Sequence, residues 1–411
     1  MNLTQIPEFN NILSGFDNTS NILKINKIKS KISNAIYSVI RYNKQLLTSD
    51  LISSYGLFRS VILNSQNKVV SFAPPKSISA ENFIKKYPDN DNNSCILAEE
   101  FIEGTMINVF WDSSLGINGG WEISTRNTPG ATCSFFKNYK NKSFRDMFLE
   151  ATIANNLDIN YLNKLYCYSF VLQHPENRIV IPFKQPQLYL VAIYSIEYIE
   201  KNIFVNVFDH YTYKDYFHAN NITIKLPEIY QFNKYSELIE KYASMNTSYN
   251  IVGVVLYNKY TNERTKIRNP VYEQVRYLRG NQPKLQYQYL SLRKEGKVKD
   301  FLKFYPENKK QFSEFRDQLH LFTNTLFNNY KSCYVKKEKP LCEFTEQYKT
   351  HMYNIHQIYL NTLREENLFV NNSIVQKYVN DMQTALLMYS LNFQMRKRNI
   401  DTIKSDFRLI Y

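Results

Sequence analysis

The stretch EEFIEGTMINVF, residues 99–110, decides how the fold is interpreted. Two acidic residues and Phe101 lead into Glu103-Gly104-Thr105, and a mostly apolar run follows. A short apolar run bounded by a glycine turn predicts a strand that buries at least one face. The stretch therefore predicts β structure here, with Phe101 placed directly before a sharp change of chain direction.

The composition limits the class of protein. The chain has 411 residues, 44% of them hydrophobic, which is enough for two or three packed units. No apolar run is long enough to span a bilayer, and the first residues lack the basic-then-apolar pattern of a signal peptide. The five cysteines are scattered and do not pair with the six histidines at metal-site spacings. We expect a cytoplasmic chain with reduced thiols, no metal site and no membrane contact.

The net charge of +14 is the first indication of a partner. Basic globular proteins often bind phosphate-rich molecules, most commonly nucleic acid. However, the chain is crowded with Lys, Asn, Ile and Tyr, which an AT-rich genome produces without any selection for binding. The charge alone supports both explanations equally. The 33 tyrosines and 27 phenylalanines add little, because stacking on bases and burial in a core both use aromatic rings.

Three patterns follow one another along the chain. Residues 1–50 space their apolar positions at three and four with lysines between, which predicts a helical lead. Residues 51–280 hold short β-branched runs between turn residues, among them a hairpin with its turn at residues 64–68, and predict an α+β domain with antiparallel sheets. Residues 281–411 follow helical spacing with breaks near Pro306, Pro340 and Asn371, and predict an all-α C-terminal domain.

Several short segments, in this order, resemble phage-type RNA ligases of the covalent nucleotidyltransferase superfamily. They are LFRSVIL with KVVSFAPPK, EEFIEGTMI, WEISTRN, YSFVLQHPENRIV, VGVVL and TKIRNPVY, spread over roughly residues 55–275. The resemblance implies a nucleotidyltransferase fold followed by a helical domain. In that family a lysine in K-x-D/E-G attacks the α-phosphorus of ATP, and the AMP passes to an RNA 5′-phosphate before a 3′-hydroxyl displaces it.

The chain departs from the family pattern at three positions. Phe101 stands where the nucleophilic lysine is expected, and Val171 and Val252 stand where the family has glutamates that hold metal. The resemblance therefore implies a pseudoenzyme with no catalytic residue, no metal and no cofactor. Aromatic and β-branched residues also favour strands, so all three can equally be ordinary core residues.

The cations of the family pattern are mostly kept. Lys266 and Arg268 occupy the final K-x-K motif, and Lys76 lies where related ligases carry a lysine that could replace the missing amine. Residues 276–300 form a basic, tyrosine-rich junction suited to single-stranded RNA, or simply a solvated helix face with tyrosines buried beneath it. The predicted RNA-binding or nucleotide-binding residues are Arg59, Lys76, Glu103, Arg126, Arg178, Lys266, Arg268, Arg276 and Arg279.

Three functions stay open at this point. The first is an inactivated RNA-ligase-like protein that binds RNA, at a 5′ end or cap, and joins an mRNA-processing or translation-related complex through protein partners of its helical domain. The second is an active RNA ligase with a displaced lysine, which would need ATP and Mg²⁺. The third is a scaffold whose former active site has closed. The AT-rich composition and the resemblance together suggest a large DNA virus, and so the host cytoplasm or a viral factory.

Overall fold

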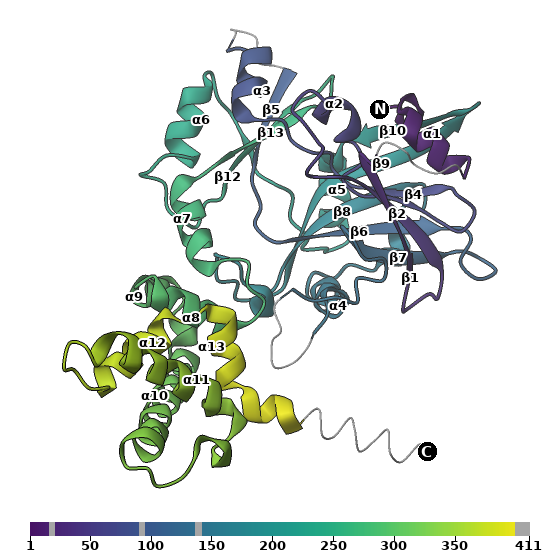
Figure 1. Ribbon diagram of the computed structural model, residues 1–411. Coiled ribbons are helices and arrows are strands. Elements are labelled where there is room, and N and C mark those ends of the chain that lie inside the picture. Colours follow the sequence, from purple (N-terminus) through teal and green to yellow (C-terminus); the bar gives the residue numbers. More distant parts are fainter. Residues whose placement is uncertain (16–20, 90–94, 136–141, 399–411) are drawn as a thin grey trace, which may run out of the picture. The chain divides into compact units, whose positions relative to one another are not determined.

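The computed structural model describes residues 1–15, 21–89, 95–135 and 142–398 (Figure 1). Contacts divide the chain into two compact units, Met1–Tyr277 and Leu278–Tyr411. The first unit combines antiparallel sheets with helices, and the described part of the second contains only helices, so the expected α+β class is confirmed. The division falls within helix α7 (Pro270–Arg279), near the boundary expected at residue 280. The described residues include no helix that is both long and apolar enough to cross a membrane.

Three antiparallel sheets build the first unit. Their strand orders are β1-β2-β3-β4, β10-β9-β8-β6-β7 and β11-β5-β12-β13. The strands are β1 (Leu23–Lys29), β2 (Ile36–Tyr42), β3 (Val61–Leu63), β4 (Val69–Phe72), β5 (Ile96–Glu100), β6 (Thr105–Asp112), β7 (Gly120–Thr125), β8 (Tyr166–Gln173), β9 (Gln187–Ile199), β10 (Asn202–Phe208), β11 (Ile229–Tyr230), β12 (Gly253–Asn258) and β13 (Arg264–Arg268).

Helices cover the sheets of the first unit and build the second. Those of the first unit are η1 (Leu3–Gln5), α1 (Pro7–Leu13), α2 (Ile52–Tyr55), α3 (Ala80–Lys86), α4 (Phe144–Ala154), η3 (Ile159–Tyr161), η4 (Pro175–Asn177), η5 (His210–Thr212), α5 (Tyr213–Ala219) and α6 (Tyr235–Tyr242). After α7 come α8 (Leu285–Lys294), α9 (Val298–Phe304), η6 (Pro306–Asn308), α10 (Lys309–Tyr330), η7 (Lys331–Val335), η8 (Leu341–Glu343), α11 (Glu346–Ile358), η9 (Tyr359–Leu363), α12 (Asn372–Asp381) and α13 (Thr384–Leu391).

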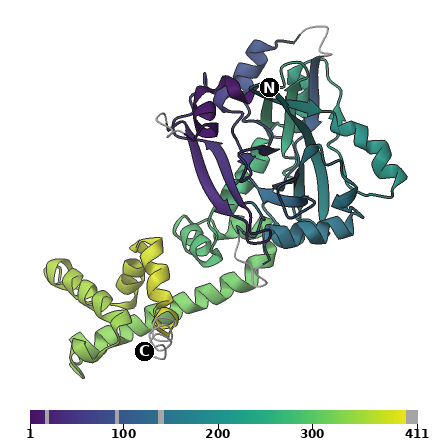
Figure 2. The same ribbon diagram turned by 90° about the vertical axis from the view of Figure 1, so that its right-hand side faces the viewer.

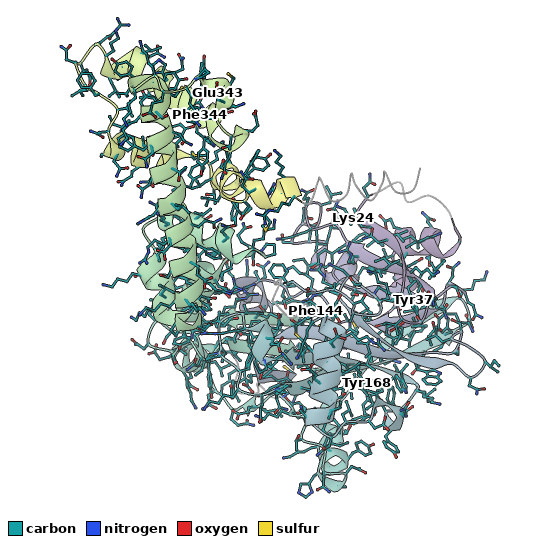
Figure 3. All side chains as sticks on the ribbon, turned by 90° about the horizontal axis from the view of Figure 1, so that it is seen from below. Lys24, Tyr37, Phe144, Tyr168, Glu343 and Phe344 are labelled. Carbon is teal, nitrogen blue, oxygen red and sulfur yellow. The ribbon has the colours of Figure 1, made fainter. Side chains whose placement is uncertain are left out.

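The five-stranded sheet is buried on both faces. One face packs against the first sheet and α1, where the rings of Tyr37 and Phe110 meet edge to face with centroids 5.9 Å apart. The other face packs against α4, where the rings of Phe148 and Phe170 lie with centroids 5.9 Å apart. Figure 3 labels Tyr37 and Tyr168, which belong to the cores on these two faces. The sheet therefore lies between the two cores of the unit.

The third sheet is covered on one face only by helices. Phe83 of α3 and Leu238 of α6 pack against Val254 and Leu256 of β12, and Figure 1 shows both helices beside this sheet. Successive side chains of a strand point to opposite faces. Residues of β12 between these two, such as Val255, therefore point to the face that α3 and α6 leave open.

The helical lead expected over residues 1–50 is wrong for most of its length. Besides η1 and α1, the described part of this stretch forms β1 and β2, which pair as antiparallel neighbours. The spacing that suggested a helix comes from Ile25, Ile28 and Ile32, yet β1 is an edge strand that leaves Ile25 37% exposed. Isoleucine favours strands, and pairing with β2 outweighs a helical period that no packing partner uses.

Other sequence predictions are confirmed. β3 and β4 form the expected hairpin, and the Asn64 side chain accepts hydrogen bonds from the N–H groups of Gln66 and Lys68 within its turn. In the second unit, helices end before Pro306 and begin again at Asn372. The apolar stripe of α10 is buried where this long helix, clearest in Figure 2, contacts α8, α11, α12 and α13.

Candidate functional site

A cavity of about 170 Å³ opens between the second and third sheets, around Phe101. Val171 of β8 and Gly104 before β6 line it from the side of the five-stranded sheet. The open face of the third sheet lines it from the other side. We call this space the Phe101 cavity.

The strand register explains which residues of the third sheet reach the cavity. Glu99 of β5 is paired with Val255 of β12, which in turn is paired with Lys266 of β13. These three residues lie in one row across the sheet and all line the cavity. Because the side-chain period of a strand is two, Arg264 and Lys266 share one face of β13. The Glu99 carboxylate therefore lies on one side of Val255, and the basic groups of Arg264 and Lys266 lie on the other.

Phe101 lies beneath two of the cations. It follows β5, and its backbone N–H donates to the carbonyl of Gly253 at 3.3 Å. The Lys266 Nζ lies 4.4 Å from the centre of the Phe101 ring, and the Arg268 guanidinium carbon lies 5.6 Å from it. Both distances are within the range in which a cation is attracted to the face of an aromatic ring. The Lys266 amine and the Arg268 guanidinium therefore lie over the ring that occupies the position where the resemblance expects a lysine.

Two glycines of the motifs, Gly104 and Gly253, lie in close contact with neighbouring backbone atoms. A Cβ at Gly253, where φ is +135°, would lie 2.1 Å from the carbonyl oxygen of Ile267. A Cβ at Gly104, where φ is +151°, would lie 2.4 Å from the carbonyl oxygen of Leu172. Both positions therefore require glycine, because a side chain has neither the space nor the backbone conformation. The backbone frame of the motifs is kept.

The two valines differ in position. Val171 lines the Phe101 cavity, so an apolar side chain forms the wall where the resemblance expects a carboxylate. Val252 is buried immediately before β12 and is outside the cavity lining. Its carbonyl accepts the N–H of Asn269 at 2.9 Å. Val252 therefore acts as a core residue at the end of the sheet.

Positive charge gathers on one side of the cavity. We call Arg59, Lys76, Arg264, Lys266 and Arg268 the cationic cluster. Burial, followed by the charges of Arg264 and Arg59, lowers the pKa of Lys266 to about 5. Burial, followed by the charges of Arg264 and Arg126, lowers the pKa of Arg59 to about 10. Burial is the larger cause of both shifts and the neighbouring charges add to it, so both factors weaken the charged forms of these groups.

Carboxylates do not balance this charge in the described part of the chain. Of the cationic cluster, only Arg268 forms an ion pair there, with Glu273 at 2.8 Å. Glu99 faces the cavity, but burial raises its pKa to about 7, and its Oε1 accepts a hydrogen bond from the Tyr211 hydroxyl at 3.0 Å. An anion entering the cavity would relieve the repulsion and satisfy the free donors.

Two carboxylates, Glu99 and Glu100, are part of the lining of the Phe101 cavity. Within the described ranges, no group of three or more His, Cys, Asp or Glu side chains is arranged to hold a metal ion. Two of the positions where the resemblance expects carboxylates are valines, and Glu99 accepts a hydrogen bond from Tyr211. A phenyl ring at residue 101 has no lone pair with which to attack phosphorus.

Glu103, predicted to bind RNA or nucleotide, is placed away from the cavity. It is 4% exposed, and its Oε1 accepts hydrogen bonds from the N–H groups of Val180 at 3.1 Å and Ile181 at 3.0 Å. Arg178 donates from Nε to the Val180 carbonyl at 2.9 Å, in the same loop. The PENRIV segment, residues 175–180, is thus held to the β5–β6 connection by Glu103.

The remaining predicted residues divide into two groups. Arg126 lies beside the cationic cluster, since its Nε donates to the Arg59 carbonyl at 3.2 Å and its guanidinium lies over the Tyr42 ring. Arg276 lies outside the cavity and pairs with Glu273 at 3.2 Å. Arg279 belongs to the second unit. The structure therefore brings together Arg59, Lys76, Lys266, Arg268 and Arg126 from the predicted set.

Sequence reasoning missed Arg264 and Glu99. Arg264 is 5% exposed and lines the cavity. The signal was available, because Arg264 lies two residues before Lys266 on the same strand and so shares its face. Glu99 was visible only as part of an acidic pair, and its place in the row with Val255 follows from strand pairing.

The chain was compared with known proteins. No protein-family model matches the chain. An RNA ligase of Rhodothermus phage RM378 is 25% identical over 297 residues, which cover 62% of this chain and 64% of the phage protein. The Naegleria gruberi RNA ligase, in structures with ATP and Mn and with pyrophosphate, is 13% and 12% identical with TM-scores of 0.35 and 0.33, and each covers 49% of this chain and 57% of the other.

Similarity to the phage ligase, together with the ordered motifs, supports a relationship to RNA-ligase-like nucleotidyltransferases. The match spans 64% of the length of the phage ligase, a little less than two thirds.

Proposed function

We propose that this chain no longer forms a lysine adenylate at residue 101 and instead binds the 5′-phosphorylated end of an RNA in the Phe101 cavity. The observation that carries the proposal is the cationic cluster around the ring of Phe101, in which Arg59, Arg264 and Lys266 have no carboxylate partner in the described residues. Phosphate is the anion of RNA, and arginine recognises it with paired hydrogen bonds.

The protonation of Lys266 supports the same proposal. With its pKa near 5, the amine is neutral at pH 7 in the free protein. A bound phosphate favours the charged amine, so binding takes up a proton and adds a donor to the site.

The role in an mRNA-processing or translation-related complex, in the cytoplasm or a viral factory, is the wider part of the proposal. The second unit exposes large apolar side chains, among them Leu321 at 68%, Val335 at 64% and Phe369 at 76%. Exposed apolar side chains are common where proteins bind one another. They support the expectation of protein partners for the helical unit.

The first experiment tests the loss of catalysis. The full chain is incubated with labelled ATP or GTP and Mg²⁺ or Mn²⁺ and separated under denaturing conditions. We expect no labelled band at 48.8 kDa. A band would refute the proposal and support the active alternative. Peptide mapping would then be expected to find the label on Lys266, whose pKa is about 5, ahead of the exposed Lys76.

The second experiment tests RNA binding. Capped, 5′-phosphorylated and 5′-hydroxyl oligonucleotides are compared at two salt concentrations. We expect the 5′-phosphorylated strand to bind most tightly, with a log–log salt slope of about −0.7 for each phosphate neutralised. Lys266→Glu should abolish the preference for the 5′-phosphate, and Lys24→Glu, on exposed strand β1, is the matched control (Figure 3). If no strand binds in a salt-dependent way, the scaffold function replaces the proposal.

A further inference from the structure

Lys266 presents a neutral amine to the Phe101 cavity. It lines the cavity, and its Nζ lies 4.4 Å from the centre of the Phe101 ring. Burial, followed by the charges of Arg264 and Arg59, lowers its pKa to about 5, so the amine has a free lone pair at pH 7. A lysine with a pKa near 10.4 is neutral at this pH in fewer than about one molecule in a thousand. The free amine of Lys266 is therefore a nucleophile.

The arginines beside this amine lack a negative partner. Arg264 is 5% exposed and lies two residues before Lys266 on the same face of β13. Its Nη1 donates to the Tyr257 hydroxyl at 3.4 Å, and its buried Nε has no partner among the described residues. Arg59 donates from Nη1 to the Pro74 carbonyl at 3.4 Å and forms no ion pair in the same part of the chain. A carboxylate placed next to these guanidinium groups would be stabilised by charge-assisted hydrogen bonds.

The carboxylates already in the lining of the cavity are held by other groups. Glu99 accepts a hydrogen bond from the Tyr211 hydroxyl at 3.0 Å. Glu100 accepts the backbone N–H of Glu228 at 3.4 Å. Within the described ranges neither side chain pairs with a member of the cationic cluster. The missing negative charge therefore has to come from elsewhere.

The cavity has room for a small electrophile at the Lys266 amine. Its volume is about 170 Å³, whereas a water molecule needs only about 10–15 Å³. Carbon dioxide has three heavy atoms and no charge, so it enters without losing the hydration of an ion. The lone pair of Nζ attacks the carbon, an N–C bond forms, and the electron pair of one C=O π bond moves to oxygen. The nitrogen gives a proton to water, so the amine and carbon dioxide become a carbamate anion and a proton.

We propose that Lys266 reacts reversibly with carbon dioxide to form a carbamate, whose carboxylate pairs with Arg264 and Arg59. The modification converts a lysine into the negative group that the cationic cluster lacks in the described part of the chain. The inference goes beyond the proposed function and does not depend on RNA binding. A carbamate and a bound phosphate would use the same arginines, so carbon dioxide would compete with the phosphate.

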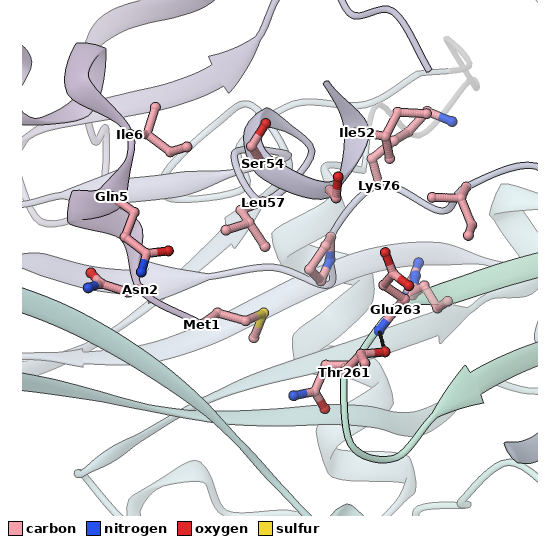
Figure 4. Close-up of a pocket in the computed structure, with 15 residues that line it drawn as sticks. Met1, Asn2, Gln5, Ile6, Ile52, Ser54, Leu57, Lys76, Thr261 and Glu263 are labelled. Atoms are coloured by element: carbon pink, nitrogen blue, oxygen red, sulfur yellow. Dashed lines mark hydrogen bonds between the residues drawn. The ribbon is translucent and has the colours of Figure 1, made fainter. Parts of the chain in front are cut away.

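Lys76 is a comparison within the cationic cluster. It is exposed, its Nζ donates to the Ser77 carbonyl at 3.2 Å, and it lines a separate cavity of about 320 Å³ (Figure 4). That cavity lies among the N-terminal segment, helix α2 and the turn between β12 and β13. Ion pairs of exposed groups contribute little in water. Lys76 should therefore be modified far less than Lys266.

The test uses the full chain, equilibrated at pH 7 with isotopically labelled bicarbonate in a closed vessel. The triethyloxonium ion then alkylates the carbamate oxygen and makes the modification permanent, and mass spectrometry of the digested chain locates it. We expect the labelled carboxyl group on Lys266 at least about tenfold more often than on Lys76 or on the exposed Lys85 of α3, because only a neutral amine reacts. Degassing before alkylation should remove the label, which distinguishes a carbamate from the irreversible product of cyanate.

Two variants test whether the arginines hold the carbamate. Arg264→Gln should lower the occupancy of Lys266 by about tenfold, as expected when a charge-assisted hydrogen bond is lost. Arg59→Gln should act in the same direction and keeps the test decisive if the first variant does not fold. Arg316→Gln, at an exposed arginine of α10, is the matched control and should keep the wild-type occupancy.

The outcomes separate this inference from the proposed function. The absence of a labelled carboxyl group on Lys266 at every bicarbonate concentration overturns the carbamate. Equal labelling of Lys266 and Lys85, or undiminished occupancy in both arginine variants, overturns it as well. Labelled Lys266 without binding of 5′-phosphorylated RNA leaves the carbamate standing and overturns the proposed function. RNA binding without labelled Lys266 does the reverse.

Discussion

Replacing Lys266 with methionine should change how the stability of the protein depends on pH. Lys266 has a pKa of about 5 in the folded protein, against an ordinary value near 10.5 when unfolded. Between these values the unfolded chain carries a proton on this amine that the folded chain lacks. Protons therefore favour unfolding, and the free energy of unfolding rises with pH through this window.

The magnitude follows from the proton count. One proton bound only in the unfolded state changes the free energy of unfolding by about 1.4 kcal/mol per pH unit. Lys266→Met removes that proton, so the variant should be more stable than the wild type. Its advantage should shrink by about 2.7 kcal/mol between pH 6 and pH 8. Below pH 5 both states of the wild type are protonated, and the advantage should be constant.

Urea unfolding followed by circular dichroism at pH 6, 7 and 8 measures this difference. All other titrating groups are common to both proteins and cancel in the comparison. Lys85→Met, an exposed lysine of α3, is the control and should follow the wild type at every pH. If the wild type and Lys266→Met show parallel dependence on pH, the amine is protonated in the folded protein and the electrostatic reasoning about the cavity fails.

Three further predictions follow from the same unit. Glu103→Ala leaves two buried backbone N–H groups without an acceptor and should cost about 2–4 kcal/mol of unfolding free energy, whereas Glu103→Gln, which keeps an oxygen, should cost less. Equal losses in urea titrations would contradict the role of the Glu103 carboxylate as acceptor for Val180 and Ile181. Gly253→Ala forces a Cβ to 2.1 Å from the Ile267 carbonyl oxygen and should lower the free energy of unfolding by at least about 3 kcal/mol. A melting temperature within a few degrees of the wild type would show that β12 has room for the methyl group. Burial raises the pKa of Glu99 to about 7, so between pH 4.5 and pH 7 the folded state binds a proton that the unfolded state lacks, and stability falls as the pH rises. Glu99→Gln should remove this fall, and denaturation of both proteins at pH 5 and pH 7 measures it. An unaltered fall in the variant would rule Glu99 out as its source.

The sequence predicted the elements whose signals are local. The β-branched runs and the turn at Asn64 predict the β3–β4 hairpin, and prolines predict helix breaks in the second unit. The lead over residues 1–50 failed because the partner of β1 is β2, and sheet pairing is not visible in the spacing of isoleucines. Periodicity describes one segment, whereas a strand is stabilised by its neighbour.

In the site, too, local features could be predicted from the sequence, whereas features that depend on distant segments could not. Phe101, Val171 and Val252 were located by their motifs, yet only the first two line the cavity. Lys266 was predicted as a cation, but its neutral state depends on burial and on the charges of Arg264 and Arg59, which come from different segments. The cavity of about 320 Å³ among the N-terminal segment, helix α2 and the turn between β12 and β13 could not be predicted at all, because three segments distant in sequence enclose it.

The contact between Phe101 and Lys266 has a consequence for any amine placed at residue 101. A Phe101→Lys substitution would add a further amine to the cationic cluster, where burial and neighbouring charges already lower the pKa of Lys266 to about 5. The new amine would meet the same burial and the same charges, so the substitution should be destabilising. The ring of Phe101 therefore acts as a spacer that separates the neighbouring basic groups without adding a charge of its own.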